Sequence, residues 1–291
     1  MIDAVIDQDD RFRGVLDRLS SKSIDDYYNP YRLFEWPESL PENMWWMSPE
    51  LTTTHDSDVA ATLNEQQLFA LSRFESVNFY SLNVHGIREL LIEVVRRIHT
   101  SGFETPSEFF HHFIGEENEH MWFFAEFCLR YGGRIYRQPG GGVAIPSAAS
   151  TKVESLLVFA RILIFEELVD HYNSRMAKDE RLHETIRGIN RIHHQDESRH
   201  IAFGRELVEL LFEDVRRTAT DDELLDISNY LRRYLTYSFE SLFNPQAYRD
   251  AGIEQPYELR QALLASPARA QAEQRVFRKT IRYLNKTGIV R

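Results

Sequence analysis

The chain has 291 residues and a formal net charge of −11, with 45 acidic residues against 34 Lys and Arg. It is long enough to bury the core of one large domain, and its acidity argues against a nucleic-acid partner, which would require a basic surface. The sequence contains no apolar run long enough for a transmembrane helix and no export signal at its start, so we expect a soluble, cytoplasmic protein with no membrane partner.

Residues 1–60 are predicted to form an irregular arm. Four prolines interrupt regular helix in this stretch: Pro30, Pro37, Pro41 and Pro49. Aromatic side chains cluster between residues 27 and 46 and need a surface to bury them. We therefore expect residues 1–60 to wrap the outside of a helical body, with Trp45 and Trp46 packed against it rather than stacked on a substrate.

Four long helices are predicted in the middle of the chain, at residues 63–100, 107–130, 152–176 and 182–212. Apolar residues recur there at spacings of three and four, which is typical of a helix with one buried face. A glycine-rich connector at residues 138–146 joins the second helix to the third. Further helices are expected at residues 221–239 and 257–284. The predicted fold class is all-α, with one helical bundle domain over residues 61–291.

Two Glu-x-x-His motifs lie on separate predicted helices. One is Glu117-x-x-His120, and the other is Glu197-x-x-His200, which His193 precedes by one turn. Positions three and four apart share a helix face, so each motif points a carboxylate and an imidazole in one direction. These faces are otherwise apolar, and burying such groups is expensive unless they are paired or bound to a metal.

This pattern indicates a centre of two metal ions. Four-helix carboxylate proteins hold two iron or manganese ions with paired Glu-x-x-His helices and single glutamates from the other helices. Carboxylate and imidazole suit iron and manganese, whereas a structural zinc site would favour cysteines, and Cys128 is the only one here. The predicted metal ligands are Glu117, His120, Glu166, His193, Glu197 and His200.

The ligand pattern resembles that of the AurF-like di-iron N-oxygenases, of the p-aminobenzoate N-oxygenase type. The resemblance is carried by Glu117-x-x-His120, Glu166 and His193-x-x-x-Glu197-x-x-His200, and it is clearest over residues 71–211. The interval between Glu166 and His193 (193 − 166 = 27 residues) matches the family, which favours Glu166 over its neighbour Glu167. The resemblance implies a ferritin-like four-helix bundle with additional C-terminal helices and an irregular N-terminal arm.

The first long helix departs from the family pattern. The family also takes a glutamate ligand from this helix, but the inward position at the matching depth is Ile87. Glu89 lies at nearly that depth but points about 200° around the helix, and Glu75 shares its outer face further along. The expected ligand is therefore missing, replaced by water, or supplied by Glu89 through a local bulge.

The resemblance implies a non-haem di-iron oxygenase that activates O2 to oxidise an amine nitrogen of a small-molecule substrate, in natural-product biosynthesis. Two Fe ions, with Mn as an alternative, would be the cofactor, and no catalytic residues are predicted beyond the ligands. Electrons would come from an external reductase, because no flavin or nicotinamide motif is present. Two alternatives remain open: a C–H hydroxylase or oxidative-cleavage enzyme on the same fold, and a non-catalytic metal-binding homologue. A homodimer is one option for its assembly.

Overall fold

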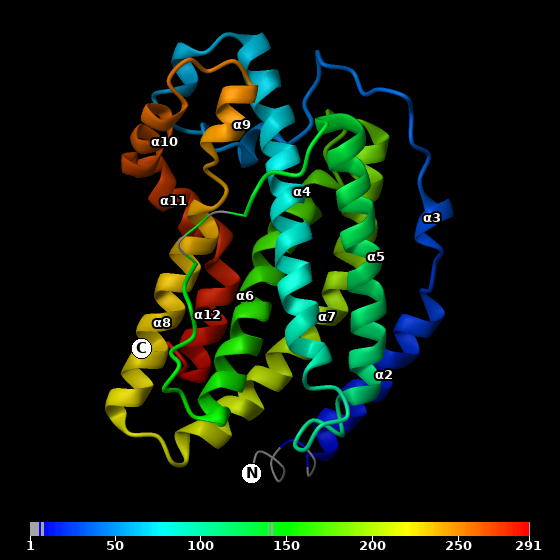
Figure 1. Ribbon diagram of the computed structural model, residues 1–291, viewed down its shortest axis with the longest axis vertical. Helices are drawn as coiled ribbons and strands as arrows, with labels where there is room; N and C mark the ends of the chain where they lie inside the picture. Colours follow the sequence, from blue (N-terminus) through cyan, green and yellow to red (C-terminus); the bar gives the residue numbers. More distant parts are fainter. Residues whose placement is uncertain (1–5, 7–8, 139, 141, 291) are drawn as a thin grey trace.

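The computed structural model describes Ile6 and residues 9–138, 140 and 142–290, and the regular secondary structure of these residues is helical. Four long helices form the body of the molecule (Figure 1). They are α4 (Glu65–Val95), α5 (Ser107–Gly132), α6 (Thr151–Met176) and α7 (Glu184–Arg216). α4 packs against α5 and α6 packs against α7, and the members of each pair run in opposite directions. The predicted all-α four-helix bundle is confirmed.

Local sequence signals set the ends of these helices. α4 begins with a capping box, in which Asn64 accepts the backbone N–H of Gln67 and the Gln67 side chain accepts the backbone N–H of Asn64. Ser150 caps α6 by accepting the N–H of Val153. α5 ends at Gly133, whose φ of 68° is left-handed and suits glycine. The ends of α6, at Ser150 and Ala177, leave Glu166 in the interior of that helix, where it is buried.

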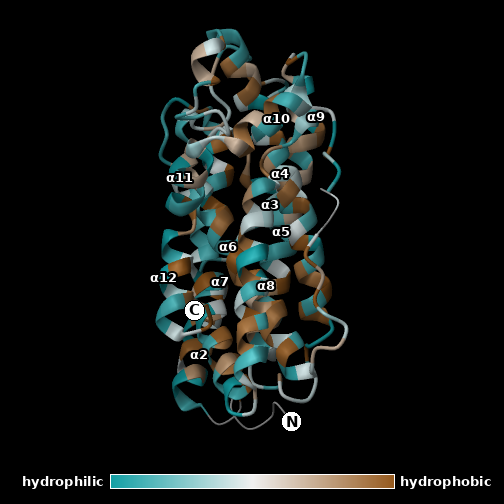
Figure 2. Ribbon diagram, turned by 90° about the vertical axis from the view of Figure 1, so that its left-hand side faces the viewer, coloured by the Kyte–Doolittle hydropathy of each residue, from teal (hydrophilic) through white to brown (hydrophobic). Residues whose placement is uncertain are grey.

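Two glycines let the helices approach each other closely. A Cβ on Gly86 of α4 would lie 2.3 Å from the Phe165 ring of α6, and one on Gly204 of α7 would lie 3.3 Å from Leu163. Both positions lie near the predicted ligands. Hydrophobic and hydrophilic residues alternate along each long helix (Figure 2), as expected for helices that bury one face each.

The N-terminal arm is more regular than predicted. It contains α2 (Asp10–Asp25), which Asp9 caps and which buries Phe12 and Leu16. The prediction of an irregular arm was wrong for this segment because its prolines begin only at Pro30, and residues 9–25 carry a helical apolar stripe. Short turns follow: α3 (Pro30–Leu33), η1 (Pro49–Leu51) and η2 (Ala60–Thr62). Trp46 is buried, and its indole N–H donates to the carbonyl of Pro41.

The C-terminal helices cover one side and one end of the bundle (Figure 1). They are α8 (Asp221–Glu240), α9 (Pro245–Asp250), α10 (Pro256–Ala265), α11 (Pro267–Val276) and α12 (Arg278–Thr287). The single helix predicted at residues 257–284 is in fact three. Ser266 ends α10 and caps α11, because Pro267 has no N–H to continue the first helix and favours the first turn of the next.

The described residues of the predicted connector at 138–146 form no helix, and residues 139 and 141 lie outside the described part of the chain. Among the helices that are described, none combines the length and apolar character needed to cross a lipid bilayer.

Candidate metal centre

The six predicted ligands come from three of the four long helices. α5 carries Glu117 and His120, α6 carries Glu166, and α7 carries His193, Glu197 and His200. Each of the six is at most 2% exposed. A cluster of ionisable groups this deep in a bundle requires either mutual pairing or a metal ion.

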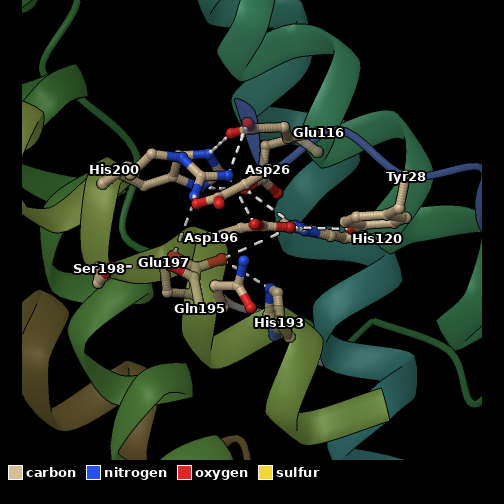
Figure 3. Close-up of polar contacts among 12 residues, drawn as sticks. Asp26, Tyr28, Glu116, His120, His193, Gln195, Asp196, Glu197, Ser198 and His200 are labelled. Atoms are coloured by element: carbon tan, nitrogen blue, oxygen red, sulfur yellow. Dashed lines mark hydrogen bonds and ion pairs between the residues drawn. The ribbon is translucent and has the colours of Figure 1, made fainter. Parts of the chain in front are cut away.

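Four of these residues form the tightest group. One ligand atom from each of Glu117, His120, Glu197 and His200 lies within 4.8 Å of those of the other three. The ring centroids of His120 and His200 are 5.8 Å apart. His193 joins the group through its Nε2, which lies 2.6 Å from Oε1 of Glu197. Figure 3 shows His120, His193, Glu197 and His200 meeting between the helices.

The inward atoms contact one another but do not pair as hydrogen bonds. Nδ1 of His200 lies 2.8 Å from Oε1 of Glu117, and Nδ1 of His120 lies 3.3 Å from the same oxygen. The buried atoms without a hydrogen-bond partner include both carboxylate oxygens of Glu117 and Glu197, Oε1 of Glu166, Nδ1 of His120 and His200, and Nε2 of His193. Buried oxygen and nitrogen atoms that lack hydrogen-bond partners and lie close together fit a metal centre, because a cation could bind all of them.

The outward nitrogens of two histidines are held crosswise between α5 and α7. Glu116, which precedes Glu117, accepts from Nε2 of His200 at 2.7 Å. Asp196, which precedes Glu197, lies 3.0 Å from Nε2 of His120. Each acidic residue therefore fixes the imidazole of the opposite helix and leaves Nδ1 free to face inward (Figure 3), which is the arrangement that orients metal-binding histidines.

A further shell ties this network to the N-terminal arm. Arg199 donates to Asp196 at 2.6 Å, to Glu116 at 2.8 Å and to Asp26 at 3.0 Å. The hydroxyl of Tyr28 donates to Asp196 at 2.9 Å. The arm thus anchors, at its first turn after α2, the two carboxylates that orient His120 and His200.

His193 is oriented by an amide instead of a carboxylate. The side-chain amide nitrogen of Asn173 on α6 lies 2.6 Å from its Nδ1, while the amide oxygen is buried without a hydrogen-bond partner. In this orientation the amide nitrogen donates to Nδ1, and the ring proton sits on Nε2. A metal ion at Nε2 would require the proton on Nδ1 and the amide of Asn173 turned over, so that its oxygen accepts. All three predicted imidazole ligands therefore have a partner on the side that faces away from the cluster.

Burial and mutual charge shift the protons of the cluster. Burial acts to lower the pKa of His120, but the carboxylates of Glu117 and Asp196 together outweigh it and raise the pKa to about 10. The pKa of His200 lies well above its ordinary value, since the carboxylates of Glu197, Glu116 and Glu117 together outweigh the lowering effect of burial. Burial and then the charge of Glu197 raise the pKa of Glu166 well above its ordinary range. Without a metal, protons balance the carboxylates in the positions where a cation would act.

Aromatic rings enclose the cluster. Phe113 lies edge-on to His200 with ring centroids 4.5 Å apart, and Phe124 lies edge-on to His193 at 4.8 Å. Phe123 packs beside His120 at 5.4 Å. Each of these phenylalanines is at most 2% exposed, so the cluster sits in an apolar shell that keeps bulk water away.

Glu166 and its neighbour Glu167 point in different directions. Glu167 points toward the outer helices, where it accepts from Arg205 at 2.8 Å and from Thr280 at 2.6 Å. Glu166 instead interacts electrostatically with Glu197 and Glu117.

α4 contributes no charged residue to the cluster. Ile87 is fully buried, whereas Glu89 is on the surface beside Arg88, and α4 is continuous there without a bulge. The sequence predicted that Glu75 lies on an outer face of α4, and this prediction was wrong. Glu75 is buried and accepts the backbone N–H of Thr53 at 2.9 Å, because the segment around Thr53 and helix α9 cover that side of α4.

Sequence reasoning missed the outer partners, namely Glu116, Asp196, Arg199, Tyr28 and Asn173. One signal was present for two of them: an acidic residue precedes the glutamate of each Glu-x-x-His motif, as Glu116-Glu117 and Asp196-Glu197. Positions next to each other on a helix point about 100° apart, so the two side chains of each pair must point in different directions. Which residue the first side chain of each pair contacts depends on how the helices pack in the bundle.

A comparison with protein families now bears on this geometry. The sequence model of the family described as p-aminobenzoate N-oxygenase AurF matches residues 9–288. The chain belongs to the AurF family. The predicted family is thereby confirmed, and with it the predicted class of enzyme, an O2-dependent di-metal oxygenase. The comparison with curated proteins found no match to this chain.

Solved structures support the same fold. An R2-like ligand-binding oxidase variant with an aerobically reconstituted Mn/Fe cofactor superposes with a TM-score of 0.52 at 12% identity, covering 95% of this chain and 93% of that one. A second variant of an R2-like ligand-binding oxidase, reconstituted anaerobically with Mn/Fe, gives a TM-score of 0.53 at 13% identity over the same shares. At these identities the likeness shows the ferritin-like fold alone.

Proposed function

We propose that this AurF family member is an O2-dependent oxygenase that oxidises an amine nitrogen of a small molecule at a centre of two metal ions. Its metal ligands would be Glu117, His120, Glu166, His193, Glu197 and His200. The observation that carries the proposal is the set of buried donor atoms from these residues that face one another without hydrogen-bond partners. Family membership supplies the reaction class.

The protein's own residues would position and protect the reaction. Two bound iron or manganese ions would supply the activation of O2. Glu116 and Asp196 hold the rings of His200 and His120 so that Nδ1 faces the centre. The phenylalanines around the cluster exclude water, which limits competing reactions there. Electrons would come from an external reductase or carrier.

A pocket that shares none of its lining residues with the cluster is the candidate substrate site. It has a volume of about 330 Å³ between α4, α6 and α8. Phe165 and Gly86 line it, and they adjoin Glu166 and Ile87 in the sequence. Tyr234 and Tyr237 add aromatic surface, and pockets of this size and lining are typical of small-molecule sites. We propose that the amine substrate approaches the centre from this side, in a biosynthetic pathway.

The proposal is tested by supplying Fe(II), a chemical reductant and ¹⁸O2 to the purified protein with a panel of aromatic amines. We expect about two irons per chain and a product with ¹⁸O on nitrogen, identified by mass spectrometry. His200→Ala should lose iron and product. His194→Ala is the matched control, because its ring contacts Asp170 at the side of α7 instead of the cluster, and it should retain both. An iron-free wild-type protein would contradict the proposal.

The same experiment separates the alternatives. ¹⁸O on carbon, or a cleaved substrate, would identify a hydroxylase or an oxidative-cleavage enzyme on the same fold. The non-catalytic metal-binding protein is the candidate that one specific observation favours, since the α4 side presents Ile87 where a carboxylate is expected. Two irons per chain without O2 consumption across the panel would support that candidate.

A further inference from the structure

We infer that α4 offers only uncharged groups to the metal centre and that the two ions therefore bind with unequal affinity, the weaker one on the α4 side. This inference rests on the proposed metal centre and deepens it. When metal is scarce, the ion on the α4 side would be lost first, and the centre would then hold one ion instead of two.

The ionisable residues in the inner part of α4 are all engaged elsewhere. Glu75 is held by Thr53, and Nε2 of His85 lies 2.7 Å from the carbonyl oxygen of Tyr136. Glu89 is exposed beside Arg88, and Glu93 pairs with Arg97 at 2.7 Å. None of these side chains can reach the cluster without breaking its present contacts.

The face that α4 turns toward the cluster is formed by Tyr80, Asn83 and Ile87, which fall within an arc of roughly 60° on the helix. Tyr80 marks this face as inward, because its ring stacks on Phe124 of α5 and its hydroxyl accepts from Asn190 of α7 at 2.7 Å. Asn83 and Ile87 are fully buried.

The depth of these residues matches that of the cluster. α4 and α7 run in the same direction (Figure 1), and Tyr80 and Asn190 are in contact. Asn83 lies three positions after Tyr80, and His193 lies three positions after Asn190. Ile87 and Glu197 lie four positions further along their helices, so they are again at matching depths. Ile87 therefore lies at the depth where a ligand from α4 would be useful.

Asn83 is the polar residue of this face that lies nearest the level of Ile87, and it is neutral. Its amide nitrogen donates to the carbonyl of Phe79 at 2.8 Å, while its amide oxygen is buried without a hydrogen-bond partner. An amide oxygen can complete a coordination shell, but it adds no negative charge. The α4 side therefore offers at most a neutral oxygen.

The charges of the donor set follow directly. Di-metal carboxylate bundles use a glutamate from each of two helices in addition to two Glu-x-x-His motifs, which makes four carboxylates. This chain has three, Glu117, Glu166 and Glu197, and gains an imidazole, His193, on α7. Three carboxylates leave one positive charge uncompensated on two divalent ions, and the deficit falls on the side where the carboxylate is missing. The ion on that side should bind more weakly.

The test is a titration of the metal-free protein with Mn(II), followed by elemental analysis and by electron paramagnetic resonance. For the wild type we expect one tight ion, seen as an isolated Mn(II) signal at one equivalent. A second ion should bind on the order of tenfold or more weakly and should convert that signal to the spectrum of an exchange-coupled pair.

Two substitutions of nearly equal size separate charge from shape. Ile87→Glu should tighten the second ion on the order of tenfold or more, so that the isolated signal is no longer seen at one equivalent. Ile87→Gln places a neutral side chain of the same shape there and should leave the ratio of the two affinities within about threefold of the wild type. Thermal unfolding of the metal-free proteins establishes that each variant is folded.

Equal affinities for the two ions in the wild type would overturn the inference even if neither variant folds, and so would an equal gain from the Glu and Gln variants. A wild type that binds no Mn(II) would instead overturn the proposed metal centre itself. The two failures are therefore distinguishable.

Discussion

At the scale of single residues, the centre depends on acidic pairs that face two ways. In Glu116-Glu117 the second carboxylate points into the cluster and the first holds His200 of the opposite helix. Asp196-Glu197 repeats the arrangement toward His120. Two adjacent carboxylates thus serve different helices, which ties the orientation of each imidazole to the packing of α5 against α7.

We expect Glu116→Gln to weaken Mn(II) binding on the order of 10- to 100-fold while the protein stays folded. The amide keeps the shape of the side chain but removes the charge that orients His200. The affinity is measured by titration of the metal-free protein. Glu126→Gln is the control, since Glu126 lies on the same helix but pairs with Arg130 near the surface. Equal affinities for the two variants would contradict the orienting role.

Glu75 should make the stability of the fold depend on pH. Burial raises its pKa from 4.5 to about 7, despite hydrogen bonds from Thr53 that act in the other direction. Between these values the folded protein keeps a proton that the unfolded chain releases, so the free energy of unfolding falls as pH rises through this window and then levels off. The loss that this group contributes is at most about 3 kcal/mol.

Glu75→Gln removes this titration. Urea unfolding at pH 5 and pH 8 should therefore show a smaller loss of stability in the variant than in the wild type. Because all other titrating groups are shared, the difference between the two proteins isolates Glu75. Identical losses in both proteins would show that this carboxyl does not hold its proton at pH 5 to 7.

At the scale of helices, the position of Glu166 depends on how closely α4 approaches α6. Gly86 admits the ring of Phe165, the residue that precedes Glu166. Any side chain on Gly86 would push the two helices apart or displace the ring. The contact between Gly86 and Phe165 therefore affects both the distance between α4 and α6 and the position of Glu166.

Gly86→Ala should destabilise the protein by about 1–3 kcal/mol through overpacking. Gly115→Ala on α5 is the control, because a Cβ there meets nothing within 4 Å, and it should stabilise the helix by about 0.5–1 kcal/mol. Urea unfolding of both variants measures the difference. If Gly86→Ala proved as stable as Gly115→Ala, the contact would not be tight.

At the scale of the whole molecule, a group of buried ionisable side chains is held in the centre of an apolar bundle. Their inward atoms lack hydrogen bonds, and such groups destabilise a folded protein unless they are satisfied. A bound cation would remove this penalty in the native state only. Metal binding and folding should therefore be linked.

We expect Mn(II) or Fe(II) to raise the temperature of thermal unfolding, and a chelator to reverse the rise. At a free metal concentration about 100 times the dissociation constant, one site adds about 2.7 kcal/mol to the free energy of unfolding. His200→Ala should lose most of this gain, whereas His194→Ala should keep it. A metal-independent unfolding temperature in the wild type would contradict the link.

The sequence alone determined the helical class, the four long helices and the six candidate ligands, because periodicity and motif spacing are local properties of a helix. It also indicated that Ile87 occupies the position of an expected carboxylate. The sequence-based predictions missed α2, whose residues precede the prolines of the arm, and the division of residues 257–284 into three helices.

Only the tertiary structure decided which groups meet. The structure joins residues distant in the chain: Glu116 with His200, Asp196 with His120, Arg199 with Asp26, and Glu75 with Thr53. Helix periodicity specifies the direction of a side chain relative to its own axis, but its neighbour depends on how the helices are paired, rotated and spaced. The candidate ligands could therefore be proposed from the sequence, whereas the groups that contact their outer atoms could not.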